Sequence, residues 1–244
     1  MKKNRILMMA FAAILIVGVV SCGKDENTSG NGENNGGDNP GGGGDTIAEW
    51  VDLGLPSGIL WAMCNLGANS PEEYGNYYAW GETQSKEVYN WSTYCHCTVD
   101  GEGSLQTLTK YNTSSNYGTP DNLTTLEAID DAATATLSNG ARTPTKEEWV
   151  ELINNTTVEW MTLNGVNGCK FTASNGNTLF LPAAGTYYGT GVVSAGNGGY
   201  YLSSSLSDQE PDNAWGYYFD SGIRNMNNTA RRYGGFSVRA VRQN

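Results

Sequence analysis

The sequence predicts an α+β fold, a loop-rich domain in which two helices lie beside small antiparallel sheets. Three observations support this prediction. Glycine accounts for 32 of the 244 residues. Turn-forming residues recur at short intervals between aromatic or β-branched runs. Only two segments show helical periodicity. We therefore expect short strands joined by many connections.

The clearer helix is expected over residues 143–155, which read TPTKEEWVELINN. Thr145 and Glu148 have the spacing of a capping box, and acidic residues fill the first turn. Trp149, Leu152 and Ile153 form an apolar stripe at i, i+3 and i+4. A weaker helix is expected over residues 125–137, TLEAIDDAATATL.

Strands are expected in the C-terminal half of the chain. Asn175-Gly176 predicts a hairpin, because this pair supplies the positive φ of a tight turn. Further on, Tyr217 and Phe219 are expected on the core face of one strand, with Tyr218 on the opposite face. A polar loop is expected over residues 221–232.

The last strand is expected within residues 235–242, GFSVRAVR. Phe236 and Val238 alternate there with Ser237 and Arg239, so the two pairs should lie on opposite faces of the strand. This strand would close the domain.

The N-terminus has the features of a secretory signal. Three cations precede an apolar run over residues 6–20, which is shorter than the about 20 residues that span a bilayer. The run ends at Ser21-Cys22, which resembles a bacterial lipobox. We expect residues 1–21 to be a lipoprotein signal peptide and Cys22 to carry the lipid; the alternative is an ordinary cleavage site beside a chance cysteine.

Residues 22–46 are rich in Gly, Asn and Asp, so this segment is expected to be a flexible tether with a reach of roughly 25–30 Å. Lys24-Asp25-Glu26, directly after the cysteine, resembles the signal that sends lipoproteins of the Bacteroidetes to the outer face of the outer membrane. The chain is therefore expected to be an outer-membrane lipoprotein exposed on the cell surface.

Residues 47–244 are expected to form one domain. Without residues 1–21, the chain keeps 11 Lys and Arg against 25 Asp and Glu, a net charge of −14. This charge argues against nucleic acid as a partner and against electrostatic adhesion to anionic lipid.

Four cysteines besides Cys22 fall in the domain: Cys64, Cys95, Cys97 and Cys169. Cys95 and Cys97 flank His96, the single histidine of the chain. Strand alternation would place His96 opposite both thiols, and no second ligand pair follows at the spacing of a zinc site. We expect disulfides or free thiols here, and no metal.

Several blocks together resemble one family. These blocks are WVDLGLPSGILWAMCNLGA (50–68), YYAWGET (77–83), LTKYN (108–112), RTPTKEEW (142–149), LFLPAAG (179–185) and GFSVRAVR (235–242). They resemble the Fibrobacter succinogenes major paralogous domain, which is common in lipoproteins of gut Bacteroidales. The resemblance implies a C-type-lectin-like fold, in the variant of formylglycine-generating enzymes.

The resemblance leaves the function open, because this fold hosts enzymes, lectins and display scaffolds. Formylglycine-generating enzymes use a pair of cysteines near the C-terminal end, and this sequence has no cysteine after Cys169. No other catalytic constellation is evident, so we expect neither enzymatic activity nor a cofactor. Glu210-Pro211-Asp212 partly resembles a calcium-lectin motif, but the Trp-Asn-Asp that should follow is absent; a turn explains it equally well.

The remaining hypothesis is a ligand-binding surface that needs no metal ion, formed by residues 213–232. Tyr and Trp offer rigid contact area, Asn adapts its hydrogen bonds, and Arg adds forked donors. We therefore expect a surface-tethered module that binds a glycan or a protein, with a structural role in the cell envelope as the alternative. The candidate binding residues are Trp215, Tyr218, Arg224, Asn225, Asn227, Asn228 and Arg232.

Overall fold

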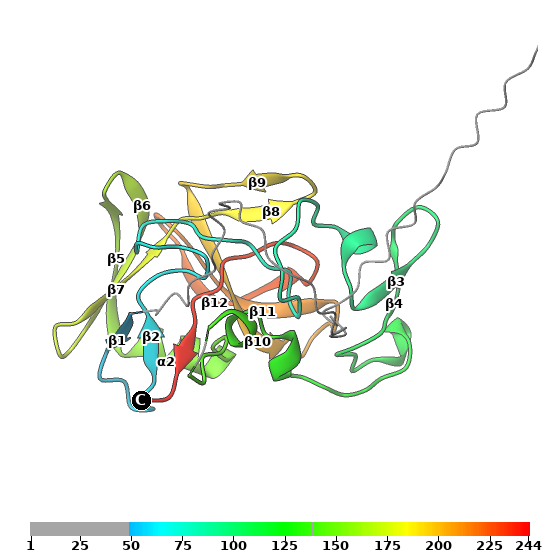
Figure 1. The fold of residues 1–244 in the computed structure, drawn as a ribbon, viewed down its shortest axis with the longest axis horizontal. Coiled ribbons are helices and arrows are strands. Elements are labelled where there is room, and N and C mark those ends of the chain that lie inside the picture. The colour runs from blue at the N-terminus through cyan, green and yellow to red at the C-terminus, as the bar shows by residue number, and fades with distance from the viewer. Residues whose placement is uncertain (1–48, 138) are drawn as a thin grey trace, which may run out of the picture.

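The computed structural model describes residues 49–137 and 139–244 (Figure 1). The predicted signal peptide and Cys22 lie outside the described residues, as do the tether and the first two residues of the predicted domain. The described chain forms short strands, two α-helices and three 3-10 turns, which confirms the α+β class. None of the described helices is long and apolar enough to cross a membrane.

The strands form small antiparallel sheets. The central sheet has the order β10-β11-β12 and lies between the other sheets in Figure 1. A second sheet has the order β5-β6-β7, and a third has the order β1-β2-β13, which joins the two ends of the described chain. The strands are β1 (Trp50–Asp52), β2 (Leu60–Ala62), β5 (Thr156–Leu163), β6 (Val166–Ala173), β7 (Thr178–Pro182), β10 (Gly198–Leu206), β11 (Asn213–Asp220), β12 (Arg224–Arg231) and β13 (Val241–Arg242).

Two-stranded ribbons and short helices complete the fold. The ribbons are β3 (Cys97–Val99) with β4 (Leu105–Leu108), and β8 (Thr186–Tyr188) with β9 (Gly191–Val193). The helices are α1 (Ala132–Thr136) and α2 (Lys146–Asn154), and the 3-10 turns are η1 (Trp91–Thr93), η2 (Ser115–Tyr117) and η3 (Ala128–Asp130).

Helix α2 confirms the stronger helix prediction. The Thr145 side chain accepts from the Glu148 amide and the Glu148 carboxylate accepts from the Thr145 amide, so the expected capping box is present. Trp149 and Leu152 are buried, and Ile153 packs against the same core. The helix begins at Lys146 because the capping box satisfies the amides of its first turn.

The weaker helix prediction is only partly right. The segment divides into η3 and the five-residue α1, since Asp131 between them is extended and caps α1 through the amides of Ala133 and Thr134. The predicted hairpin is confirmed: β6 pairs with β7, and Gly176 has φ +86° in the connecting turn.

The central sheet is buried on both faces. One face carries Tyr217 and Phe219 into a core that also contains Trp149 and Phe171. The opposite face packs Tyr200 and Leu202, among others, into a second core. Tyr217 and Phe219 are therefore core residues, as the alternation predicted, but the face that carries Tyr218 is covered as well.

The C-terminal predictions require two corrections. The predicted loop 221–232 is mostly strand β12, because the Asp220 carboxylate accepts from the amides of Gly222 and Ile223 and closes a tight turn. In the closing segment only Val241–Arg242 is a named strand, and Ser237 and Arg239 are buried like Phe236. Arg239 is inside because it donates to carbonyl oxygens of β2 and β7.

Candidate functional site

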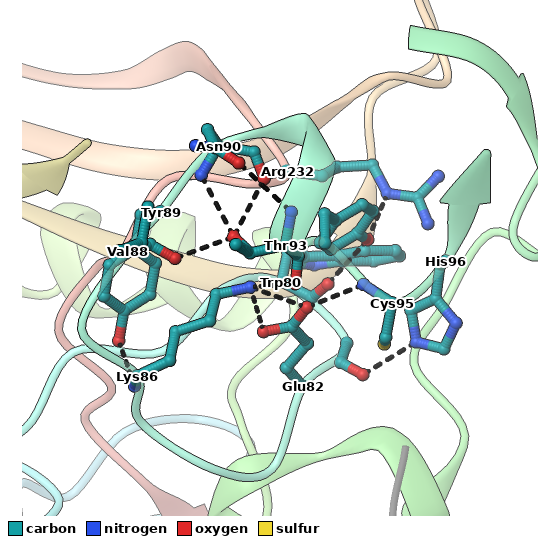
Figure 2. A network of polar contacts seen from close by, with 12 residues as sticks. Trp80, Glu82, Lys86, Val88, Tyr89, Asn90, Thr93, Cys95, His96 and Arg232 are labelled. Atoms are coloured by element: carbon teal, nitrogen blue, oxygen red, sulfur yellow. Dashed lines mark hydrogen bonds and ion pairs between the residues drawn. The ribbon is translucent and has the colours of Figure 1, made fainter. Parts of the chain in front are cut away.

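Arg232 does not lie on a binding surface, contrary to the sequence prediction. Its side chain is 0% exposed and lies across the Trp80 ring, 4.9 Å from the ring centroid (Figure 2). It donates to the Tyr94 hydroxyl at 2.8 Å and to the carbonyl oxygens of Lys110, Tyr111 and Pro211 at 2.9–3.0 Å. Arg232 therefore joins segments of the chain that are distant in sequence.

Trp215 is also internal, and this corrects a second candidate. It is 6% exposed in the core that contains Tyr217. The ammonium group of Lys146, at the start of α2, lies 3.4 Å from the centroid of its ring. This cation–π contact and the burial make Trp215 a structural residue.

Three of the predicted binding residues share one face of the central sheet. Tyr218 pairs with Asn225, and Gly216 pairs with Asn228, so the side chains of Tyr218, Asn225 and Asn228 lie on one side. Asn225 is exposed, while Tyr218 and Asn228 are half-buried. The Tyr218 hydroxyl donates to Asp220 at 3.0 Å.

The two other candidates lie elsewhere. Arg224 pairs with Phe219, on the opposite face of the sheet, and its guanidinium lies beside the Cys169 thiol. Asn227 belongs to β12, but its side chain is outside the described residues.

The face with Tyr218 continues into a row of aromatic rings that the sequence analysis missed. Tyr218 contacts Tyr200, which contacts Phe236, and Phe236 contacts Tyr188. Beyond Tyr188 follow Tyr233, with ring centroids 5.8 Å apart, and Trp91, whose centroid is 4.7 Å from that of Tyr233. We call the four half-buried rings, Trp91, Tyr188, Tyr218 and Tyr233, the aromatic strip.

Neighbouring rings of the strip pack edge-to-face. The Tyr188–Tyr233 and Trp91–Tyr233 planes meet at 73° and 66°, which are edge-to-face geometries. Tyr188 comes from β8, Trp91 from η1 and Tyr233 from the segment after β12, and the buried Tyr200 and Phe236 lie beneath. In the sequence, only the short segments TYYG (186–189) and RRYGG (231–235) could have indicated that Tyr188 and Tyr233 belong to such a row.

One hydroxyl beneath the strip is unsatisfied. Tyr200 is 9% exposed, and its hydroxyl has no hydrogen-bond partner among the described residues. Burial raises the pKa of Tyr200, and the nearby Tyr188 phenol adds to this effect. Burial likewise raises the pKa of Tyr188 to about 12, and the Arg231 guanidinium acts in the opposite direction. Both phenols are therefore neutral hydrogen-bonding groups at ordinary pH.

The arginine beside the strip is paired with a carboxylate. Arg231, 47% exposed, forms an ion pair with the buried Asp212. Asp212 lies in the turn that was weighed against a calcium motif: the Asn213 amide donates to the Glu210 carbonyl at 3.1 Å, with Pro211 at a central position. The turn reading is confirmed. Among the described residues no group of three or more His, Cys, Asp or Glu side chains could hold a metal ion.

The Cys-His-Cys segment is part of the packing. The His96 ring nitrogen Nε2 is 2.8 Å from the Gly81 carbonyl oxygen and 3.9 Å from Asp130 (Figure 2 shows the Gly81 contact). The Cys97 thiol faces two carbonyl oxygens, and burial raises its pKa to about 11. Cys64, Cys97 and Cys169 are free thiols, one of the two states that the sequence left open.

A cavity of about 370 Å³ lies beside β2 and the end of α1, lined by Met63, Cys64 and Leu137 among others. Its size suits a small ligand. Burial raises the pKa of the Cys64 thiol, however, so this thiol is protonated at neutral pH and a weak nucleophile. The Cys64 thiol is therefore not poised to act as a nucleophile in this cavity.

Comparisons with known proteins find no matching family model, curated protein or solved structure.

Proposed function

We propose that this chain is a surface-tethered, non-enzymatic module that binds a glycan or a protein through the aromatic strip and the adjacent asparagines of β12. The observation that carries the proposal is the set of four half-buried rings, three of which contact one another in a row while the fourth joins them through a buried aromatic layer. Rings that are already oriented lose little entropy on binding. Asn225 and Asn228 add adaptable hydrogen bonds on the same face.

The proposal includes the anchoring that the N-terminal sequence suggests. Lipid on Cys22 and a Gly-rich tether would hold the domain at the outer face of the outer membrane, as in the lipoproteins that the sequence resembles. A domain presented in this way has access to ligands outside the cell. A structural role in the envelope is the alternative that a binding experiment must exclude.

The test is a binding panel with the purified full-length chain in detergent, against glycans and cell-surface proteins. A Trp91→Ala/Tyr233→Ala variant removes two of the four rings of the strip. Trp160→Ala is the matched control, because Trp160 is also a half-buried tryptophan with an edge-to-face ring partner, but lies on β5. Near-ultraviolet circular dichroism of each variant checks its packing.

We expect the double variant to lose binding while it stays folded, and the Trp160→Ala control to retain it. Equal binding by all three proteins would place the site elsewhere on the domain. If the unmodified chain binds nothing in the panel, the structural role becomes the better account.

A further inference from the structure

We propose that the aromatic strip binds a neutral oligosaccharide without calcium, with the Tyr200 hydroxyl as a hydrogen-bonding group of the site. This inference rests on the proposed function and specifies its ligand class. Four features of the strip support it: the row of half-buried rings, the unsatisfied hydroxyl, the mixed composition and the pairing of nearby charges.

The rings suit a chain of sugar units. Tyr188, Tyr233 and Trp91 follow one another with centroid separations of 5.8 and 4.7 Å. These are ordinary edge-to-face contact distances, and the part of each half-buried ring that stays exposed is available to the C–H groups of a sugar. Half-buried rings that are fixed by a buried layer offer such contacts along a row rather than at one point.

The polar groups suit a ligand that is rich in hydroxyls. Tyr200 lies directly beneath the strip, in contact with Tyr218 and next to Tyr188, and its buried hydroxyl is unpartnered among the described residues. A buried hydroxyl without a hydrogen-bond partner lowers the stability of the fold. A role in ligand binding would explain why a tyrosine rather than a phenylalanine occupies this position. A water held between it and a sugar hydroxyl would satisfy it.

The composition of the strip favours a sugar over a protein. The centre of a protein interface is typically an apolar cluster from which water is excluded. Here three of the four rings are tyrosines, and Asn225 and Asn228 lie on the sheet face that carries Tyr218. This mixture matches the alternating C–H and O–H groups of a saccharide.

Charge indicates that the sugar is neutral and that calcium is not needed. Arg231, the cation that acts on Tyr188, is paired with Asp212, and the Lys86 ammonium is paired with Glu82. An acidic sugar would have to compete with these carboxylates for its cation. Because Arg231 already neutralises Asp212, the turn at residues 210–213 does not need a metal ion.

The test measures binding of the full-length chain to cellohexaose, chitohexaose and mannohexaose by calorimetry, with oligogalacturonate as the acidic probe. Each titration is run with calcium and with a chelator. The key variant is Tyr200→Phe, which removes only the hydroxyl. Tyr217→Phe is the matched control, because its hydroxyl is also buried and unpartnered among the described residues but lies in the other core.

We expect at least one neutral hexasaccharide to bind equally in calcium and in chelator, and Trp91→Ala to weaken it by about tenfold or more. Tyr200→Phe should weaken it by roughly fivefold, the effect of one lost hydrogen bond, without lowering the midpoint of thermal unfolding. Tyr217→Phe should leave binding unchanged.

The inference is overturned if no neutral hexasaccharide binds, if binding requires calcium, if the acidic probe binds more tightly, or if Tyr200→Phe binds like the unmodified chain. The proposed function would remain supported after any of these results if the unmodified chain binds another ligand of the wider panel and the Trp91→Ala/Tyr233→Ala variant does not bind that ligand.

Discussion

At the scale of single residues, the arginines near the C-terminus divide into two classes that composition does not distinguish. Arg232 and Arg239 are 0% exposed, and each donates hydrogen bonds to carbonyl oxygens from distant segments. Arg231 is adjacent in sequence but points outward and pairs with Asp212. An arginine is retained inside because its five donors can satisfy several carbonyl groups at once.

We predict that Arg232→Lys destabilises the domain by about 2–4 kcal/mol, because one ammonium cannot replace four hydrogen bonds and the contact with Trp80. Arg231→Lys keeps the charge beside Asp212 and should cost less than about 1 kcal/mol. Urea unfolding of both variants measures the difference. Equal losses would show that the buried contacts of Arg232 contribute little.

At the scale of elements, local hydrogen bonds decide where helix α2 begins. The Thr145 hydroxyl accepts from the Glu148 amide at 3.3 Å, and Glu148 also receives two hydrogen bonds from Arg142. These contacts span only a few residues, so their pattern is visible in the sequence. The helix then packs Trp149 against Trp61 of β2, with ring centroids 4.8 Å apart.

We predict that Thr145→Ala lowers the free energy of unfolding by about 1 kcal/mol through loss of the N-cap. Thr119→Ala, at an exposed position outside helices and strands, is the control and should have little effect. Chemical denaturation followed by tryptophan fluorescence reports both changes. A loss no larger than that of the control would mean that Glu148 holds the helix start without Thr145.

The neighbouring element β12 illustrates what local patterns miss. Its sequence, RNMNNTAR, has low strand propensity. It forms a strand because the Asp220 turn directs it back along β11, whose backbone groups it then pairs with. The backbone hydrogen bonds to β11 therefore decide the conformation of this segment, in spite of its low intrinsic strand propensity.

At the scale of the whole molecule, the pH dependence of stability includes one histidine whose contribution a single substitution can isolate. His96 is the only histidine of the chain and is buried beside Asp130 and the Gly81 carbonyl. Burial lowers the pKa of His96 below its ordinary value, although these two neighbours oppose the shift. The neutral ring is therefore the form that the folded domain favours.

We predict that the domain loses stability as the pH falls from about 6.5, the pKa of an unfolded histidine, toward the lower folded value. In that interval the unfolded chain binds a proton that the folded chain does not, so acid favours unfolding, by at most about 1.4 kcal/mol per pH unit. His96→Gln should remove this slope between pH 5 and 6.5. Thermal unfolding of both proteins at several pH values measures this slope. If the slope is the same in the variant, other titratable groups cause the loss of stability.

The candidate site shows how much the sequence could predict. Tyr218, Asn225 and Asn228 could be proposed from the sequence because their segment is rich in aromatic and amide side chains, and the structure places them on one face of the sheet. Trp91 and Tyr188 were missed because their neighbours in sequence give no sign that they lie near residue 233. Trp215 has the parity of Tyr217, so alternation alone places it in the core where it lies; the aromatic and amide-rich composition of its segment pointed to a surface instead.

The sequence by itself determined the features that depend on nearby residues: the cap and apolar stripe of α2, the Asn-Gly turn, the turn at Glu210–Asn213 and the alternation of Tyr217 with Phe219. Only the tertiary structure decided which polar residues are buried and which rings form the strip. The physical reason is range. A capping or turn hydrogen bond joins groups a few residues apart, whereas burial depends on what packs over a residue from elsewhere in the chain.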